Sequence, residues 1–263
     1  MKVAFLQTSP AFGEVERNVE RAIKKIGPLD AGLVVLPELF STGYQFRSRE
    51  EVRRLSETVP DGYASLRLRE AAALTNKTIV AGIAEKSGRR FYNSSVIVTP
   101  EGISGVYRKA HLFRNEKRMF SPGDTPFEVY NVGGVRLGMM ICFDWLFPEV
   151  ARTLALKGAD IICHPSNLVL PYCPEAMITR SLENRVFSIT ANRVGTEERI
   201  AGESLGFIGS SQVVSPAGTV LIRAGGKKEE SGVVEIDPLE ARKKDITPEN
   251  NVLSDRRTDL FGL

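Results

Sequence analysis

The sequence is poor in residues that cross-link a chain or bind metals: its 263 residues include only 3 cysteines and 2 histidines. Three cysteines do not make a disulfide framework in a chain of this length, so a reducing cytoplasm is the expected location. The 35 Lys+Arg nearly balance the 32 Asp+Glu, and a net charge of +3 is too small to indicate a nucleic-acid partner. No run of 18 apolar residues occurs, so we expect no membrane partner.

Metal and nucleotide motifs are also missing. Cys163, His164 and Cys173 lack the paired Cys-x2-Cys or His-x3-His spacing of a zinc site. Neither a P-loop nor a Gly-x-Gly-x-x-Gly segment is present. The sequence therefore supports neither zinc nor nucleotide chemistry.

What the chain does contain is an alternation of short apolar runs with helical patterns. Such runs fit strands that are buried on both faces. No low-complexity linker divides the chain, so we expect one layered α/β domain over residues 1–263. We expect strands at 2–8, 32–36, 78–84, 94–99, 103–107, 135–141, 159–163 and 188–191, and helices at 14–27, 63–74, 148–157 and 175–187.

Four segments predict turns or surface structure. Thr99-Pro-Glu-Gly102 and Ser215-Pro-Ala-Gly218 have the proline and glycine positions of a type I turn, and each is expected to close a hairpin. The stretch 225–230, Gly-Gly-Lys-Lys-Glu-Glu, is expected to be an exposed hairpin turn. The charged tail, about 238–263, is expected to pack on a surface or a partner subunit.

Cys142 stands where an apolar strand is expected to run into a sharp turn and then a helix that begins near Pro148. The positive end of a helix favours a thiolate, so this position suits a nucleophile. A cysteine that ends an apolar strand can equally be a small core residue.

Glu38 and Lys109 stand at the ends of two other expected strands. A carboxylate in such a buried place has a raised proton affinity, which suits a general base. The lysine could stabilise an oxyanion. The alternatives are an N-cap or surface role for Glu38 and a solvated role for Lys109. A Cys-His pair of Cys142 with His164, which also follows an apolar run, is a rival catalytic arrangement.

Taken together, three segments resemble the nitrilase superfamily of carbon-nitrogen hydrolases, and their order and spacing match over essentially the whole chain. The segments are Leu-Pro-Glu38-Leu-Phe-Ser-Thr-Gly-Tyr, Tyr-Arg-Lys109-Ala-His-Leu-Phe and Met-Ile-Cys142-Phe-Asp-Trp-Leu-Phe-Pro-Glu.

The resemblance implies a four-layer αββα sandwich with a Glu-Lys-Cys triad. Cys142 would be the nucleophile, Glu38 the general base and later acid, and Lys109 the stabiliser of the tetrahedral intermediate. Glu116 matches a second glutamate that helps to position the substrate, and the Phe143 backbone amide would join the oxyanion site. This chemistry proceeds through a thioester and needs no metal or organic cofactor.

The resemblance also implies a small-molecule amide or nitrile substrate. The Cys-Phe-Asp-Trp context favours an aliphatic amidase, with an aliphatic nitrilase as the alternative. An N-carbamoyl amine hydrolase is the less favoured third alternative, because the apolar segment 165–171 lacks the basic residues that would bind an N-carbamoyl amino acid. The family associates through the helices after the nucleophile, so we expect a homodimer or higher homo-oligomer. The expected pocket walls are Tyr44, Phe46, Trp145, Asn167 and Leu168.

Overall fold

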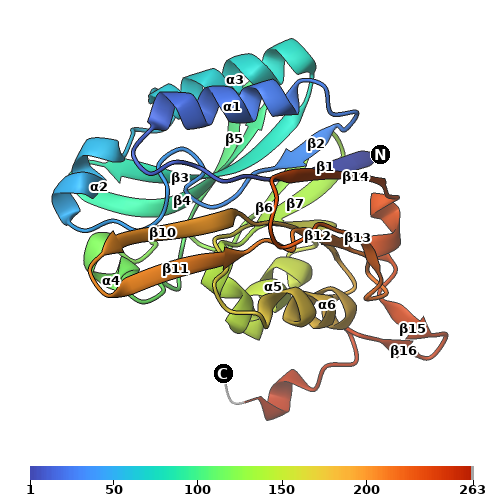
Figure 1. The fold of residues 1–263 in the computed structure, drawn as a ribbon. Coiled ribbons are helices and arrows are strands. Elements are labelled where there is room, and N and C mark those ends of the chain that lie inside the picture. Colours follow the sequence, from blue (N-terminus) through green and yellow to red (C-terminus); the bar gives the residue numbers. More distant parts are fainter. Residues whose placement is uncertain (262–263) are drawn as a thin grey trace.

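Two six-stranded sheets pack face to face between two pairs of helices in the computed structural model, which describes residues 1–261 (Figure 1). Helices α1 (Val15–Ile26) and α3 (Tyr63–Thr75) cover the first sheet, and α5 (Pro148–Leu156) and α6 (Cys173–Asn184) cover the second. The predicted four-layer αββα sandwich is thereby confirmed.

The first sheet has the order β14-β1-β2-β3-β4-β5 and the second the order β13-β12-β9-β8-β7-β6. Strands β1, β2 and β3 run parallel, as do β7, β8 and β9. The strands of the first sheet are β1 (Lys2–Gln7), β2 (Leu33–Val35), β3 (Thr78–Ser87), β4 (Arg90–Thr99), β5 (Gly102–Arg108) and β14 (Glu230–Glu235). Those of the second are β6 (Val129–Val132), β7 (Val135–Met139), β8 (Ile161–Pro165), β9 (Phe187–Ala191), β12 (Gln212–Val214) and β13 (Val220–Arg223).

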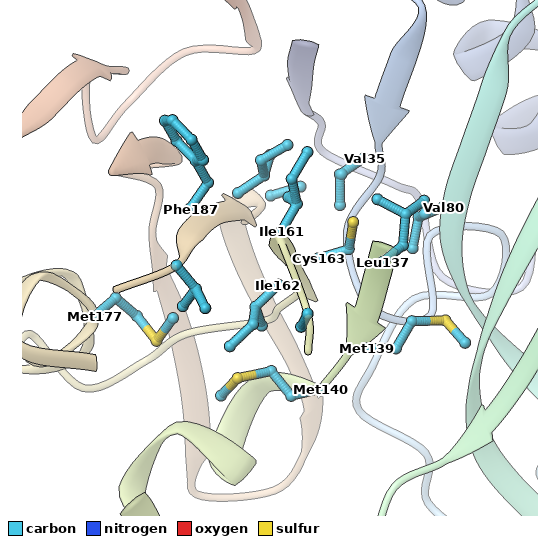
Figure 2. Close-up of a cluster of buried hydrophobic side chains, with 14 of the residues drawn as sticks. Val35, Val80, Leu137, Met139, Met140, Ile161, Ile162, Cys163, Met177 and Phe187 are labelled. Atoms are coloured by element: carbon cyan, nitrogen blue, oxygen red, sulfur yellow. The ribbon is translucent and has the colours of Figure 1, made fainter. Parts of the chain in front are cut away.

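Both faces of the central strands are buried, which is why their sequences are apolar without alternation. In β1, Val3 and Phe5 belong to the core between the sheets, while Leu6 belongs to the core under α1 and α3. Figure 2 shows Val35 of the first sheet facing Cys163 of the second. Cys163 is therefore a core residue.

The two predicted turns are confirmed as the hairpins β4–β5 and β12–β13, one at an edge of each sheet. The prediction for 225–230 was wrong. Strand β13 pairs with β12 in the second sheet, whereas β14 pairs with β1 in the first, so this stretch crosses between the sheets. Gln7 of β1 anchors the crossing, since its amide nitrogen donates to the carbonyls of Gly225 and Lys228, both at 2.8 Å.

Several short elements were not predicted. They include helices α2 (Arg49–Leu55) and α4 (Glu116–Met119), a 3-10 helix at Cys142–Leu146, the strands β6 and β14, and the hairpin of β10 (Val194–Ile200) with β11 (Glu203–Ile208). Among the described residues, no helix has the length and apolar character required to cross a bilayer.

The C-terminal segment leaves the sandwich beside α6 (Figure 1). It contains 3-10 turns at Pro238–Arg242 and Thr258–Leu260 and the small strands β15 (Asp245–Thr247) and β16 (Asn250–Asn251). Arg242 pairs with buried Asp160 at 3.0 Å, and Lys244 donates to the carbonyl of Arg185 at the end of α6 at 2.8 Å. The tail is thus fixed to its own chain up to Lys244, and the last two residues of the predicted tail lie outside the described residues.

Candidate active site

Glu38 follows β2, and its side chain is fully buried. Lys109 and Asn93 both donate to its Oε1, at 2.6 and 2.7 Å, while its Oε2 has no hydrogen-bond partner. The backbone of Glu38 lies directly against Gly82 of β3, where a Cβ would collide with the Glu38 Cα. The absence of a side chain at Gly82 therefore lets the carboxylate sit at this depth.

Lys109 follows β5 and is also buried, with 1% of its surface exposed. Its Nζ donates to Glu38 and, at 2.9 Å, to Oε1 of Glu116, the first residue of α4. The hydroxyl of Tyr44 donates to the same Glu116 oxygen at 2.6 Å. The ammonium is therefore held between two carboxylates.

Cys142 begins the 3-10 helix and has φ 41°, a left-handed conformation that is unfavourable for a residue with a side chain. The turn is held by its neighbours. Asp144 accepts from the backbone N–H of Ile141 at 2.9 Å, and Nε2 of His164 lies 2.9 Å from the Cys142 carbonyl oxygen.

The charge states of the three groups follow from burial and from one another. Burial raises the pKa of Glu38 to about 7, with Glu116 adding to the rise and Lys109 opposing it. Burial alone would lower the pKa of Lys109, but the charges of Glu116 and Glu38 outweigh it and raise that pKa. Lys109 is therefore an ammonium at neutral pH.

The expectation that the helix position would favour a thiolate at Cys142 was wrong. Burial and the negative charge of Glu38 raise the pKa of the Cys142 thiol well above its usual range, and Lys109 offsets this only in part. The position at the start of a short helix does not compensate for these effects. Cys142 is therefore a thiol at rest and needs a base before it can attack.

Asp144, for which the sequence indicated no role, ties the Lys109 segment to the Cys142 turn. Its buried carboxylate accepts from the Tyr107 hydroxyl at 2.8 Å and the His111 backbone N–H at 3.2 Å, and His111 Nδ1 lies 2.8 Å away. Tyr107 and His111 flank Lys109 in sequence. The same carboxylate thus aligns the two segments through hydrogen bonds.

His164 does not act as the rival pairing requires. Its Nε2 faces the Cys142 carbonyl oxygen, and its Nδ1 lies 3.1 Å from the Thr190 hydroxyl. Burial lowers the pKa of His164 to about 4, so the ring is neutral at neutral pH. Its contacts hold the backbone of the turn.

Two neighbouring hollows lie at the site, one lined by Glu116 and the other by Cys142. One, of about 430 Å³ including its solvent-open part, contains Tyr44, Phe46 and Glu116. The other contains Cys142 and Phe143 with the predicted wall residues Trp145, Asn167 and Leu168. Phe113 and Val169 line both hollows and were not predicted. Asn93 was also missed, although the polar run Asn93-Ser-Ser95 inside an apolar strand could have indicated it.

Comparison with known proteins decides the family, since residues 2–244 match the family model described as Carbon-nitrogen hydrolase. The chain belongs to the carbon-nitrogen hydrolase family. The members of this family are enzymes, and this chain is therefore a carbon-nitrogen hydrolase. The resemblance to the nitrilase superfamily is confirmed.

Three similar proteins indicate the range of activities. The chain is 50% identical to a nitrilase of Pyrococcus abyssi, with 99% of each chain covered. It is 36% identical to an (R)-stereoselective amidase of Pseudomonas sp., covering 100% of this chain and 93% of that one. A solved amidase mutant from Nesterenkonia sp. AN1 matches with TM-score 0.81 and 26% identity, over 99% and 95% of the two chains. That structure contains the acetamide moiety of fluoroacetamide added covalently at the active-site cysteine.

Proposed function

We propose that the protein hydrolyses the carbon–nitrogen bond of a small aliphatic amide to a carboxylate and ammonia through a thioester on Cys142. The observation that carries this proposal is the buried Glu38 carboxylate. Its Oε1 is occupied by Lys109 and Asn93, and its Oε2 is unpartnered. A base with a pKa of about 7 is matched to proton transfer at neutral pH.

The first half of the reaction forms the thioester. Oε2 of Glu38 takes the thiol proton, and Sγ of Cys142 attacks the amide carbon. Lys109 Nζ and the Phe143 backbone N–H stabilise the negative oxygen of the tetrahedral intermediate. The carbon–nitrogen bond then breaks, and ammonia leaves with the proton that Glu38 returns.

The second half releases the acid. Glu38 takes a proton from a water molecule, and the resulting hydroxide attacks the thioester carbon. The carbon–sulfur bond breaks, and Cys142 regains its proton from Glu38. In both halves Glu116 and Tyr44 hold Lys109 in place. Every proton is carried by residues of this chain or by water.

An aliphatic nitrile is the second candidate substrate. The 50% identity with the Pyrococcus abyssi nitrilase favours it, and the same three residues serve it. Attack of Sγ on a nitrile carbon gives a thioimidate, whose nitrogen receives the thiol proton from Glu38. A water molecule deprotonated by Glu38 adds to its carbon, ammonia leaves, and the thioester that remains is hydrolysed by a second water as above. The hollow beside Glu116 is walled largely by apolar side chains, including Phe46, Met119 and Leu205, which suits a short aliphatic chain in either case.

We also propose a homodimer in a reducing cytoplasm. All three cysteines are free, which agrees with a reducing compartment.

The proposed dimer surface is the outer helix layer, where Leu156 of α5 and Leu182 of α6 are each 48% exposed. The tail leaves the sandwich beside this layer (Figure 1). A second copy placed against this layer would cover both leucines and the tail.

A panel of substrates tests the function. Ammonia release is measured with acetamide, propionamide, succinamate, N-carbamoylputrescine, propionitrile and succinonitrile, for the wild type and for Cys142→Ala. We expect release from at least one amide or nitrile and none from the variant. If the wild type releases no ammonia from any of them and iodoacetamide does not label Cys142, the protein is a binding protein on a hydrolase fold.

A further inference from the structure

An ion pair between Arg193 and Glu197 is buried near the candidate active site, with side chains only 1% and 5% exposed. Arg193 follows β9 and Glu197 lies in β10. The guanidinium also donates to the Pro10 carbonyl at 3.2 Å and lies 4.0 Å from the centre of the Phe207 ring. Burying two charges is costly, and such a pair often contributes little to stability compared with apolar residues. Its contacts therefore need another explanation.

The Glu197 carboxylate holds the backbone of the segment that carries Tyr44. It accepts from the N–H of Tyr44 at 3.2 Å and from the N–H of Gln45 at 2.6 Å. Gly43, with φ 81°, allows this approach, because a Cβ there would lie 3.0 Å from the Glu197 carboxylate. The conformation and the space both require glycine at this position.

Phe207 supports the Tyr44 ring from the side. The two rings meet edge to face with centroids 6.0 Å apart, and the Arg193 guanidinium stacks on the Phe207 ring. The ion pair thus contacts Tyr44 in two ways, through the backbone and through Phe207.

Tyr44 in turn fixes the carboxylate beside Lys109. Its hydroxyl and the Lys109 ammonium donate to the same oxygen of Glu116, at 2.6 and 2.9 Å. Without the hydroxyl, the Glu116 carboxylate has one fewer contact to keep its orientation, and Lys109 can shift away from Glu38. Hydrogen bonds therefore connect Glu197 to the Tyr44 segment, Tyr44 to Glu116, and Glu116 to Lys109.

We propose that Glu197, held by Arg193, is a positioning residue that fixes Tyr44 so that its hydroxyl keeps Glu116 and Lys109 aligned for the reaction. The inference rests on the proposed function of Glu38, Lys109 and Cys142. It assigns a role in turnover to an ion pair that touches none of the reacting atoms.

A double-mutant cycle on the full-length protein tests this inference. Steady-state ammonia release from the best panel substrate is measured for Glu197→Gln, Tyr44→Phe and the double variant. We expect each single change to lower kcat about 10-fold with KM changed less than about 3-fold. The double variant is expected to be no slower than the slower single variant, because both changes disturb one chain of contacts.

Controls separate positioning from general damage. Asp160→Asn removes a buried carboxylate that pairs with Arg136 and Arg242 at the start of β8, and we expect its kcat to be unchanged. Glu197→Asp keeps the charge beside Arg193 but shortens the reach to the Tyr44 N–H. It is expected to fold with the lowered kcat, and it replaces Glu197→Gln if that variant does not fold.

The outcomes distinguish this inference from the proposed function. If the losses of the two single variants multiply in the double variant, or if the Glu197 variants retain full kcat, Glu197 is not a positioning residue. If Cys142→Ala still releases ammonia, the proposed function itself fails. An inactive Cys142→Ala together with a fully active Glu197→Gln rejects the positioning role alone.

Discussion

Lys109 donates to only one oxygen of the Glu38 carboxylate, at 2.6 Å, and the other oxygen has no hydrogen-bond partner. The ammonium thus orients the carboxylate without blocking it. Burial meanwhile raises the pKa of Glu38 to about 7, so that the carboxylate is basic enough to take a proton from a thiol. This asymmetry between the two oxygens is the basis of the proposed mechanism.

Replacing Glu38 with glutamine tests the asymmetry. Glu38→Gln can still accept from Lys109 and Asn93 through its amide oxygen, but its amide nitrogen cannot take a proton. We expect kcat to fall about 100- to 10,000-fold, with a small change in KM. Ammonia release at saturating substrate measures this loss. Glu70→Gln, an exposed change on α3, serves as the control and should keep the wild-type rate.

The pH dependence of the wild type follows from the same group. A carboxylate whose folded-state pKa is raised to about 7 is protonated below that pH and basic above it. We therefore expect kcat/KM to rise with pH through about 7 and to level off above it. Profiles from about pH 3.5 to 9 check this. A rise centred near pH 4.5, the ordinary pKa of glutamate, would show that Glu38 is not the raised base.

Asp144 is predicted to be essential for stability. Asp144→Asn places an NH2 group among the donors from Tyr107, His111 and Ile141, and leaves at least one of them unpaired. We expect a loss of about 3 kcal/mol in the free energy of unfolding, measured by urea titration. Asp124→Asn is the matched surface control. It weakens a half-exposed pair with Arg108 and should cost about 1 kcal/mol or less. Equal losses in the two variants would contradict the linking role of Asp144.

His164→Ala separates the proposed mechanism from a Cys-His mechanism. His164 is neutral and contacts the Cys142 carbonyl and Thr190, so we expect a loss of about 2 kcal/mol in stability. The rise of kcat/KM near pH 7 should persist in the variant, because it belongs to Glu38. Disappearance of that rise would make His164 the base.

The oligomeric state can be tested directly. We expect light scattering to give the mass of a dimer or a multiple of it. Removal of residues 245–263 should weaken association, because the tail up to Lys244 is held by its own chain and residues 245–261 are not layered on the sandwich. A monomeric mass for the full-length protein at micromolar concentration would contradict the proposed dimer.

Local patterns in the sequence predict a layered α/β domain, and the resemblance to the nitrilase superfamily adds the αββα sandwich and the triad of Glu38, Lys109 and Cys142. Apolar runs identify the buried strands, and the residues after β2 and β5 are the two that form the Glu38–Lys109 pair. Strands β3 and β4 lie between β2 and β5 in the sheet, so the meeting of Glu38 and Lys109 was expected from the resemblance and not from the strand pattern.

The contacts that hold these groups could not be predicted in the same way. Glu197 binds backbone N–H groups about 150 positions earlier in the chain, and any glutamate in an exposed hairpin has the same local signature. The crossing at 225–230 has the composition of a hairpin turn, because composition indicates a turn but not the sheet to which the next strand adds. The thiol pKa of Cys142 likewise depends on burial and on Glu38, which only the three-dimensional structure gives.

The most direct measurement is mass spectrometry of the protein quenched in acid during turnover. We expect a peptide containing Cys142 to gain the mass of the acyl group of the substrate. Hydroxylamine should remove this mass, as expected of a thioester, and Cys142→Ala should show neither the adduct nor ammonia release. Full turnover by Cys142→Ala, or an adduct on a residue other than Cys142, would contradict the proposed mechanism.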